Sequence, residues 1–385
     1  MPEPLIDVLI PVFNSAHTIR SAVESIQRQT VRDIRIVVVN DGSTDDTAEI
    51  VAAMARDDPR IELFTQPNGG IVDALNFGLA QCRAQFLARH DGDDLALPDR
   101  FARQIAYLRA NPDCVAVGGW VRHIDQNGRS LDHIVKMQSP DNADPLWAPT
   151  SEPYIVHPFL MTYTARVQAV GGYRYVFHAE DTDLYWRLRE TGKLHNLPVV
   201  LGDYRMHAGS ITSGSIVTGR VSALNSQLAA LSALRRRAGR PDLAFPKDVA
   251  KDYVAAKWPD AIFRLGARRL DPAEADRLEI AMAGKIMELA TYRPFELEVE
   301  DCEFIREAVR RHVGILKPRN QVLIRRMCAG AAGRLASKGK SREAAALVGR
   351  RFHAGVATRI AYRKLIPRPV RLGLLRVTGR GTSFK

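Results

Sequence analysis

Short apolar segments alternate with segments of helical periodicity along the first 110 residues of this 385-residue chain. Apolar stretches of strand length occur at Leu5–Phe13, Ile34–Val39, Ile61–Phe64 and Ala84–His90. Each is followed by a segment in which apolar residues recur every three or four positions, as on one face of a helix. This alternation predicts an α/β fold with a mostly parallel sheet that is flanked by helices on both faces.

Capping residues mark the expected ends of some of these helices. Ser15 and Ser43 each precede a helical segment, and their hydroxyls are suited to accept the free N–H groups of a first turn. A further helix is expected from about Asp181 to Thr191. Gly192 is its predicted C-cap, because glycine adopts the left-handed conformation of that position.

The pattern changes in the second half of the chain. The middle carries only short strand candidates, Val115–Val117 and Val199–Leu201, between connections rich in aromatic residues and proline. Beyond them the strand signals fade, and helical spacing continues with interruptions at prolines. We therefore expect an α/β domain over residues 1–220 and a helical region over residues 221–385.

Several protein classes are excluded by what the sequence lacks. The longest apolar stretches are strand-sized, well short of the ~18 residues that a membrane span needs. The N-terminus has neither the basic segment nor the small-residue cleavage site of a secretory signal. Four widely spaced cysteines form no CxxC pair, which argues against a disulfide scaffold or a zinc ribbon. These features predict a cytoplasmic location.

Polar side chains gather at the ends of three predicted strands. Asn14 follows the first strand, Asn40–Ser43 follows the second, and His90–Asp94 follows the fourth. In open α/β sheets, ligands bind beyond the carboxyl ends of the strands. Any one of these residues alone is more often an ordinary turn residue, but three clusters at one edge favour a binding site.

The Asp91-Gly92-Asp93-Asp94 turn is the most informative of the three clusters. Carboxylates this close together repel one another unless hydrogen bonds, water or a cation offsets their charge. Mg²⁺ and Mn²⁺ prefer oxygen ligands and commonly share them with the phosphates of a substrate. The turn therefore predicts a site for a divalent metal and a diphosphate. No GxGxxG motif follows the first strand, which excludes the usual dinucleotide site.

Six segments, in their order and spacing, resemble family 2 glycosyltransferases over about residues 4–215. They are Pro11-Val12-Phe13-Asn14, Asn40-Asp41-Gly42-Ser43-Thr44-Asp45, Asn68-Gly69-Gly70 with Asn76-Phe77-Gly78, Asp91-Gly92-Asp93-Asp94, Glu180-Asp181-Thr182-Asp183-Leu184 and Tyr204-Arg205-Met206-His207. The resemblance implies a GT-A type fold, a nucleotide-sugar donor, a divalent metal (Mn²⁺ or Mg²⁺) and inversion at the anomeric carbon. Asp73-Ala74-Leu75 departs from the family, because many members carry an arginine near the diphosphate there. This departure leaves open which residue supplies a positive charge near the diphosphate.

The resemblance also implies roles for individual residues. Asp181 would be the catalytic base beside Glu180, and Asp93, Asp91 and His207 would be the metal ligands. The residues expected to bind the nucleotide sugar are Pro11, Val12, Phe13, Asn14, Asp41, Gly70, Asn76, Asp91, Gly92 and Asp93. Two roles have a structural alternative, since Asp181 could simply cap its helix and a lone histidine after a strand is often structural.

These features together predict the reaction. We expect an inverting glycosyltransferase that moves a sugar from a nucleotide-diphosphate sugar, with UDP as the expected nucleotide, to a hydroxyl of a glycan or lipid-linked glycan. The resemblance places this reaction in bacterial cell-surface polysaccharide synthesis. Two alternatives stay open: a non-catalytic nucleotide-sugar binding or scaffold protein with the same fold, and a nucleotidyltransferase.

Aromatic residues on the expected acceptor side have two interpretations. Trp147, Tyr154, Tyr163 and Trp186 could stack on a sugar ring or belong to the core, and the second is more common for side chains this large. These residues therefore do not identify the acceptor beyond the class of glycans and lipid-linked glycans.

Charge is distributed unevenly along the chain. Residues 306–385 contain 21 lysines and arginines against two acids, whereas the preceding residues carry a net charge of −7. This basic C-terminal region could be a solvated helical face, a surface that docks on anionic lipid, or a nucleic-acid site. We expect no nucleic acid, because the region has little aromatic interleaving and no known motif. Docking at the inner face of the cytoplasmic membrane would suit the lipid-linked acceptors that the resemblance implies.

Overall fold

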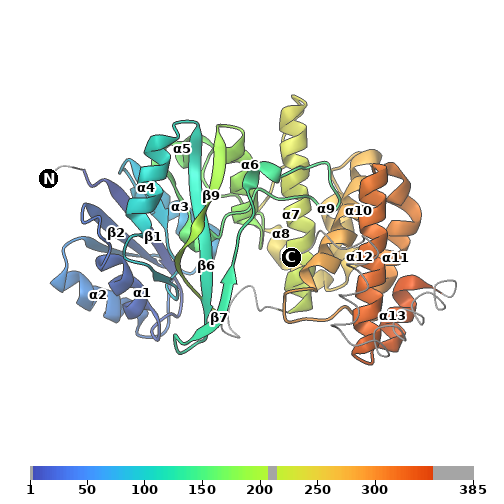
Figure 1. Ribbon diagram of the computed structural model, residues 1–385, viewed down its shortest axis with the longest axis horizontal. Coiled ribbons are helices and arrows are strands. Elements are labelled where there is room, and N and C mark those ends of the chain that lie inside the picture. Colours follow the sequence, from blue (N-terminus) through green and yellow to red (C-terminus); the bar gives the residue numbers. More distant parts are fainter. Residues whose placement is uncertain (1–2, 207–214, 350–385) are drawn as a thin grey trace, which may run out of the picture. The chain divides into compact units, whose positions relative to one another are not determined.

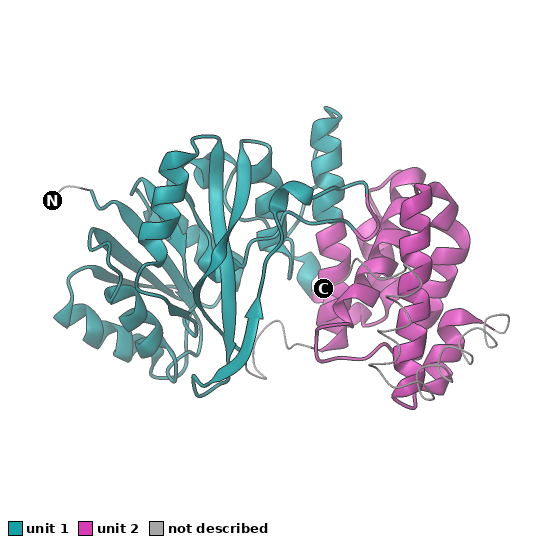
Figure 2. Ribbon diagram, in the orientation of Figure 1, with its two compact units in different colours: residues 1–146, 150–214, 228–250 teal, residues 147–149, 215–227, 251–385 magenta. Residues whose placement is uncertain are grey.

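The computed structural model describes residues 3–206 and 215–349, which divide into two compact units (Figures 1 and 2). The first unit takes its described residues from 1–146, 150–214 and 228–250, and the second from 147–149, 215–227 and 251–385. The domain boundary expected at residue 220 falls inside helix α7 (Ile216–Arg237). The first part of α7 belongs to the second unit and its last part to the first unit.

A sheet of nine strands, counted over the described residues, is the framework of the first unit (Figure 1). Its order is β3-β2-β1-β4-β8-β6-β9-β5, and β7 pairs with β6. The strands are β1 (Ile6–Val12), β2 (Ile34–Asn40), β3 (Ile61–Thr65), β4 (Phe86–Arg89), β5 (Leu95–Ala96), β6 (Cys114–Ile124), β7 (Ser130–Val135), β8 (Met161–Tyr163) and β9 (Lys193–Arg205).

The first four strands are parallel to one another, as the alternation in the sequence predicts. All residues of β1 and β2 are buried, which explains why both segments are mostly apolar. The two buried charges in them, Asp7 and Arg35, form an ion pair of 2.7 Å with each other. In the other half of the sheet β6 and β9 are parallel, whereas β5, β7 and β8 pair in antiparallel fashion. The chain therefore has the mixed α/β architecture expected for its N-terminal part.

Helices cover both faces of this sheet. One core contains the inward side chains of α1 (Ile19–Gln27), α2 (Thr47–Asp57) and α4 (Arg100–Ala110). The opposite core contains those of α3 (Ile71–Gln81), α5 (Thr164–Ala169) and α6 (Glu180–Arg189). Two short 3₁₀ turns, η1 (Pro140–Asn142) and η2 (His157–Phe159), complete the unit. This packing, with a layer of helices on each face, confirms the predicted flanking of the sheet.

The two predicted serine N-caps are wrong. Helix α1 begins after Thr18, and the Ser15 hydroxyl donates to the carbonyl of Phe13 instead of capping the helix. The Ser43 hydroxyl accepts the N–H of Asn14 at 2.9 Å, and α2 begins only after Asp46. Both hydroxyls lie in loops that brace each other at the strand ends, and this tertiary contact replaces the local cap.

Strand length and one helix end also differ from expectation. Strands β6 and β9 extend far beyond the predicted Val115–Val117 and Val199–Leu201, because they gain their partners from remote segments rather than from local apolar runs. Helix α6 ends at Arg189, so the predicted C-cap Gly192 is wrong. A Cβ on Gly192 would lie 2.8 Å from the carbonyl oxygen of Asp113, so this glycine permits close packing.

The described part of the C-terminal region is helical, as expected. Its helices are α7 (Ile216–Arg237), α8 (Val249–Ala256), α9 (Pro259–Ala267), α10 (Pro272–Leu289), α11 (Val299–His312), α12 (Pro318–Ser337) and α13 (Ser341–Val348), with the 3₁₀ turn η4 (Val313–Ile315). In the second unit the buried Arg220 forms two hydrogen bonds of 2.7 and 2.8 Å with Asp301. Among the described residues, no helix combines the length and the apolar character needed to cross a membrane.

Candidate active site

The carboxyl ends of β1, β2 and β4 lie at one edge of the sheet, as their parallel register requires. Pro11 and Val12 are buried at the end of β1, and Phe13 directly after them is 49% exposed. A large ring that is open to solvent at a strand end is available to stack on a base. The residues predicted to line a nucleotide pocket thus include a buried floor and one exposed ring.

The loops after β1 and β2 are hydrogen-bonded to each other. Asn14 has a left-handed backbone (φ 50°), its N–H donates to Ser43 Oγ, and its Oδ1 accepts the N–H of Thr44 at 2.9 Å. Asparagine tolerates this conformation better than most residues. The predicted site residue Asn14 therefore joins two of the three loops at the edge of the sheet.

Asp41 is buried at the end of β2 and holds the start of α3. Its Oδ1 accepts hydrogen bonds from Gln66 Nε2 at 2.7 Å and from the N–H of Gly69 at 2.9 Å. Its Oδ2 accepts the N–H of Gly70, the residue that precedes α3, at 2.8 Å. A carboxylate at a helix N-terminus is favourable for the helix dipole. Asp41 thus orients the loop that carries Gly70, and its contact with a base stays a prediction.

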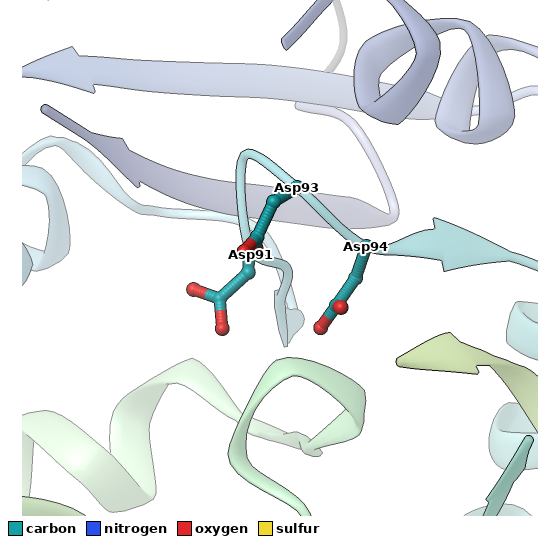
Figure 3. A group of neighbouring side chains, drawn as sticks. All are labelled: Asp91, Asp93 and Asp94. Atoms are coloured by element: carbon teal, nitrogen blue, oxygen red, sulfur yellow. The ribbon is translucent and has the colours of Figure 1, made fainter. Parts of the chain in front are cut away.

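The turn after β4 brings three carboxylates together (Figure 3). One oxygen each of Asp91, Asp93 and Asp94 lies within 4.8 Å of the other two. Gly92 lets this turn pack against the end of β1, because a Cβ there would lie 2.8 Å from Val12 Cγ1. The sequence therefore places its densest group of acids at the edge where the strand ends converge.

Asp94 carries an oxygen that lacks a hydrogen-bond partner. Its side chain is 1% exposed, its Oδ1 accepts the N–H of Arg205 at 2.8 Å, and its Oδ2 has no partner among the described residues. Burial and the charges of Asp93 and Asp91 raise the pKa of Asp94 well above its usual value. Burial also raises the pKa of Asp91 to about 6, with Asp93 adding to this rise and Arg89 opposing it.

A divalent cation would relieve both the unsatisfied oxygen and the repulsion among these acids, so the residues present fit Mn²⁺ or Mg²⁺. Asp91 and Asp93 were expected to bind the metal, whereas Asp94, which stands in the same turn, was not among the expected ligands. His207, the third predicted ligand, lies outside the described residues. Arg205 just before it donates from Nε to the backbone carbonyl of Asp93 at 2.7 Å and so fixes the turn.

Arg89 is a charged residue of this site that the sequence analysis missed. It ends β4, is 4% exposed, and forms an ion pair with Asp91. Its charge also lowers the pKa values of Asp94, Glu180 and Asp181, partly offsetting the rise that burial causes. A single arginine at the end of the apolar run Phe86–Ala88 was the available signal.

Glu180 and Asp181 open helix α6. The residue that precedes the helix is Ala179, so the structure gives no support to Asp181 as a mere N-cap. Oδ1 of Asp181 accepts the N–H of Thr182 at 2.6 Å. Burial raises the pKa of Asp181, and burial together with the charge of Asp181 raises that of Glu180 to about 7. A carboxylate with a raised pKa is a suitable general base.

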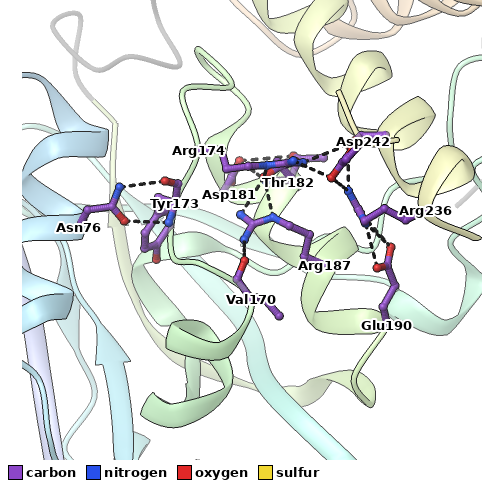
Figure 4. Close-up of polar contacts among 12 residues, drawn as sticks. Asn76, Val170, Tyr173, Arg174, Asp181, Thr182, Arg187, Glu190, Arg236 and Asp242 are labelled. Atoms are coloured by element: carbon purple, nitrogen blue, oxygen red, sulfur yellow. Dashed lines mark hydrogen bonds and ion pairs between the residues drawn. The ribbon is translucent and has the colours of Figure 1, made fainter. Parts of the chain in front are cut away.

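A network of charged side chains holds α6 in place (Figure 4). The fully buried Asp183 accepts hydrogen bonds of 2.9 Å from Arg174 Nε and from Arg187 Nε. Arg187 also donates to the carbonyl of Val170 at 2.7 Å. Because these contacts fix the first turn of α6, they fix the position of Asp181 as well.

Asn76 supports the loop that precedes α6. Its Nδ2 donates to the carbonyl of Tyr173 and its Oδ1 accepts the N–H of Tyr173, both at 2.8 Å (Figure 4). The Tyr173 hydroxyl in turn lies 2.9 Å from His157 Nε2. Asn76 was expected to bind the nucleotide sugar, and the structure gives its amide a supporting contact instead; a ligand contact stays a prediction.

The aromatic residues considered for the acceptor side differ in exposure. Trp186 is fully buried and belongs to the core, so it cannot stack on a sugar. Tyr163 packs against Phe86 with ring centroids 5.1 Å apart. Tyr154 is 37% exposed and Trp147 is half-buried in the second unit, so these two keep an accessible surface.

Comparisons with known proteins show which sequences this chain resembles. The family model described as Glycosyl transferase family 2 matches residues 7–163. The amylovoran biosynthesis glycosyltransferase AmsE of Erwinia amylovora is 30% identical over 210 residues, which span 54% of this chain and 77% of that protein. The chondroitin synthase of Pasteurella multocida is 25% identical over 216 residues, 56% of this chain but only 22% of that much longer protein.

One solved structure is similar over most of the chain. The mannosyltransferase PcManGT from Pyrobaculum calidifontis, in complex with GDP-Man and Mn²⁺, superposes with a TM-score of 0.50 over 94% of this chain and 88% of its own. The sequence identity is 16%, so this likeness concerns the fold.

Proposed function

Because this chain belongs to glycosyl transferase family 2, we propose that it transfers a sugar from a nucleotide-diphosphate sugar to a hydroxyl group of a glycan or lipid-linked glycan. UDP is the nucleotide that we propose first, and inversion is the proposed stereochemical course. Relatives named for amylovoran and chondroitin synthesis support a role in bacterial cell-surface polysaccharide synthesis. The fold has the GT-A type that the sequence resemblance implies.

The observation that carries the proposal is that two acidic groups, the turn Asp91–Asp94 and the pair Glu180–Asp181, are close enough for the charge of one to act on the pKa of the other. Asp91, Asp93 and Asp94 gather on one turn, and the charge of Asp91 adds to the raised pKa of Glu180. Arg89 acts electrostatically on both groups. One group is suited to hold a cation and a diphosphate, and the other to accept a proton, which are the two tasks of glycosyl transfer.

The metal is proposed at the first group. Asp93 and Asp91 would hold Mn²⁺ or Mg²⁺, with Asp94 Oδ2 as a further ligand from this chain. The complex of the similar mannosyltransferase with GDP-Man and Mn²⁺ supports this choice of metal and of donor class. A bound divalent cation supplies charge neutralisation for the departing diphosphate.

Asp181 is the proposed base. An acceptor hydroxyl attacks the anomeric carbon on the face opposite the diphosphate, its proton passes to a carboxylate oxygen of Asp181, and the bond from the anomeric carbon to the phosphate oxygen breaks. The nucleoside diphosphate leaves with the bonding electron pair. Asp183 and its arginines hold α6 so that Asp181 keeps its position during this step.

Product analysis tests this proposal against its two alternatives. The protein is incubated with Mn²⁺ and each of UDP-, GDP- and dTDP-sugars, with glycan and lipid-linked acceptors, and the nucleotide products are separated. Release of a nucleoside diphosphate with sugar transfer supports the proposal. Pyrophosphate as the product would identify a nucleotidyltransferase. Donor binding without turnover of any acceptor would favour a non-catalytic protein.

Membrane association is a separate proposal. The basic C-terminal region would bring the enzyme to the anionic inner face of the cytoplasmic membrane, but its last part, residues 350–385, lies outside the described residues. Flotation of the full chain with vesicles tests this. Association with anionic but not neutral vesicles at low salt supports it, and absence of co-flotation contradicts it.

A further inference from the structure

The segment that follows α7 belongs to the first unit up to residue 250 and is anchored there by Asp242. Oδ2 of Asp242 accepts hydrogen bonds of 2.8 Å from Arg174 Nη1 and from Arg236 Nη1 (Figure 4). The Ser232 hydroxyl donates to the other oxygen of Asp242. The guanidinium of Arg174 also lies 4.9 Å from the ring centroid of Phe245. This segment is therefore tied to the arginine that holds α6.

The anchored segment brings Lys247 to the first turn of α3. Its Nζ forms an ion pair with Oδ2 of Asp73, and the Tyr175 hydroxyl donates to Oδ1 of the same carboxylate. The ammonium also lies 5.6 Å from the ring centroid of Tyr175, in the arrangement of a cation–π contact. Asp73 and, more weakly, Asp41 raise the pKa of Lys247, so the ammonium stays charged.

The position of Lys247 is important for donor binding because negative charges gather around it. Asp41 and Asp73 place two carboxylates beside the loop of Gly70, where the donor nucleotide is expected, and a nucleoside diphosphate would add further negative charge. The segment Asp73–Leu75 lacks the arginine that many family members carry here. The side chain of Lys247 is 55% exposed, so its ammonium is accessible to a ligand, and its long stem lets it move from Asp73 to a phosphate.

We propose that Lys247 is a donor-binding residue whose ammonium contacts the diphosphate of the nucleotide sugar, with Asp73 and Tyr175 holding it at the mouth of the site. This inference rests on the proposed function. It deepens that function by assigning the positive charge on the donor side to a residue about 170 positions after α3 begins. No motif around Lys247 predicts this role.

The test compares binding of a nucleoside diphosphate with binding of its parent nucleoside. UDP, GDP, CDP, ADP and dTDP are titrated into the full chain with Mn²⁺ by calorimetry, and the tightest ligand is carried forward together with its nucleoside. Lys247→Gln should weaken the diphosphate roughly 5–30-fold and leave the nucleoside within about twofold. Lys247→Arg, which keeps the charge, should retain affinity within about threefold of the unchanged protein.

Lys251→Gln is the matched control, because Lys251 is an exposed lysine four residues after Lys247. This variant should bind the diphosphate and the nucleoside as tightly as the unchanged protein does. Thermal unfolding shows that each variant is folded. If Lys247→Gln leaves the diphosphate affinity unchanged, or weakens nucleoside and diphosphate equally, Lys247 does not contact the diphosphate. The proposed function is not affected by that outcome. Failure of the unchanged protein to bind any of the five nucleotides contradicts the proposed function and this inference together.

Discussion

Arg89 and Asp91, two residues apart at the end of β4, form an ion pair in which the arginine side chain is 4% exposed and the aspartate side chain 29%. Asp91 belongs to the acidic turn, and the charge of Arg89 also acts on Glu180 and Asp181 at the start of α6. Removing one partner of a buried ion pair leaves an uncompensated charge and is strongly destabilising. Arg89 is thus the counter-charge that lets this site gather so many acids.

Arg89→Gln should lower the free energy of unfolding by about 3–5 kcal/mol at pH 8 in the presence of EDTA. The pKa of Asp91 is raised to about 6 in the folded protein, above its unfolded value, so Asp91 destabilises the fold as the pH rises through 6. Without Arg89 this effect grows, and the loss should therefore be smaller at pH 5. Urea unfolding at both pH values measures it. Arg103→Gln, whose partner Asp99 is exposed, should cost no more than about 1 kcal/mol. A loss as small as that control would contradict the prediction.

Asp93→Ala should weaken metal-dependent nucleotide binding. In Mn²⁺ the variant should bind a nucleoside diphosphate about tenfold or more weakly, because a ligand of the cation is lost, whereas binding in EDTA should hardly change. Calorimetry with and without Mn²⁺ measures the difference. Asp99→Asn, an exposed acid outside the turn, is the control. Equal Mn²⁺-dependent affinity in Asp93→Ala and the unchanged protein would rule out Asp93 as a metal ligand.

Asp181→Asn should abolish transfer and preserve binding. Loss of a general base typically lowers the rate 10²–10⁴-fold, and the amide keeps the shape of the side chain and can still accept the N–H of Thr182. Initial rates of nucleoside diphosphate release, together with donor affinity, separate the two effects. Glu180→Gln serves as the neighbouring control and should lose less activity. Transfer at an undiminished rate in Asp181→Asn would remove Asp181 from the mechanism.

The rate of transfer should fall as the pH is lowered, because the base must be unprotonated. The pKa of Asp181 is raised by burial and that of Glu180 to about 7 by burial and the charge of Asp181, so the two carboxyls titrate as a pair. Glu180 is the member of the pair with the pKa of about 7, so Glu180→Gln removes the higher of the two titrations and should move the acidic limb of the profile to lower pH. Rates between pH 5 and 9 at saturating donor measure this. A limb that stays in place, or moves to higher pH, contradicts the assigned coupling.

The strands and helices of the first 110 residues could be predicted because they are local patterns. β1 and β2 are buried on both faces, so most of their residues are apolar and the pattern is clear, although Asp7 and Arg35 interrupt it as a buried ion pair. β6 and β9 are long strands with positions that are only partly buried, and their extent depends on pairing with each other across about 80 residues. No window of the sequence contains that information.

The candidate site divides in the same way. Asp91, Asp93, Glu180 and Asp181 stand in short motifs and could be identified before the structure was known. Asp94 is a candidate ligand only because the fold buries its Oδ2 without a hydrogen-bond partner in the part of the chain that the structure describes. Asp41 was expected at a base, and the structure shows its carboxylate holding the N-terminus of α3.

By itself, the order of apolar runs, turns and acids determined the fold class, the family and the edge of the sheet where the candidate site lies. Only the tertiary structure decided which charges compensate one another: Arg89 with Asp91, Arg174 with Asp183, and Lys247 with Asp73. The physical reason is that apolar periodicity acts between neighbours in the chain, whereas a buried carboxylate is stabilised by whichever cation the fold brings within a few ångströms.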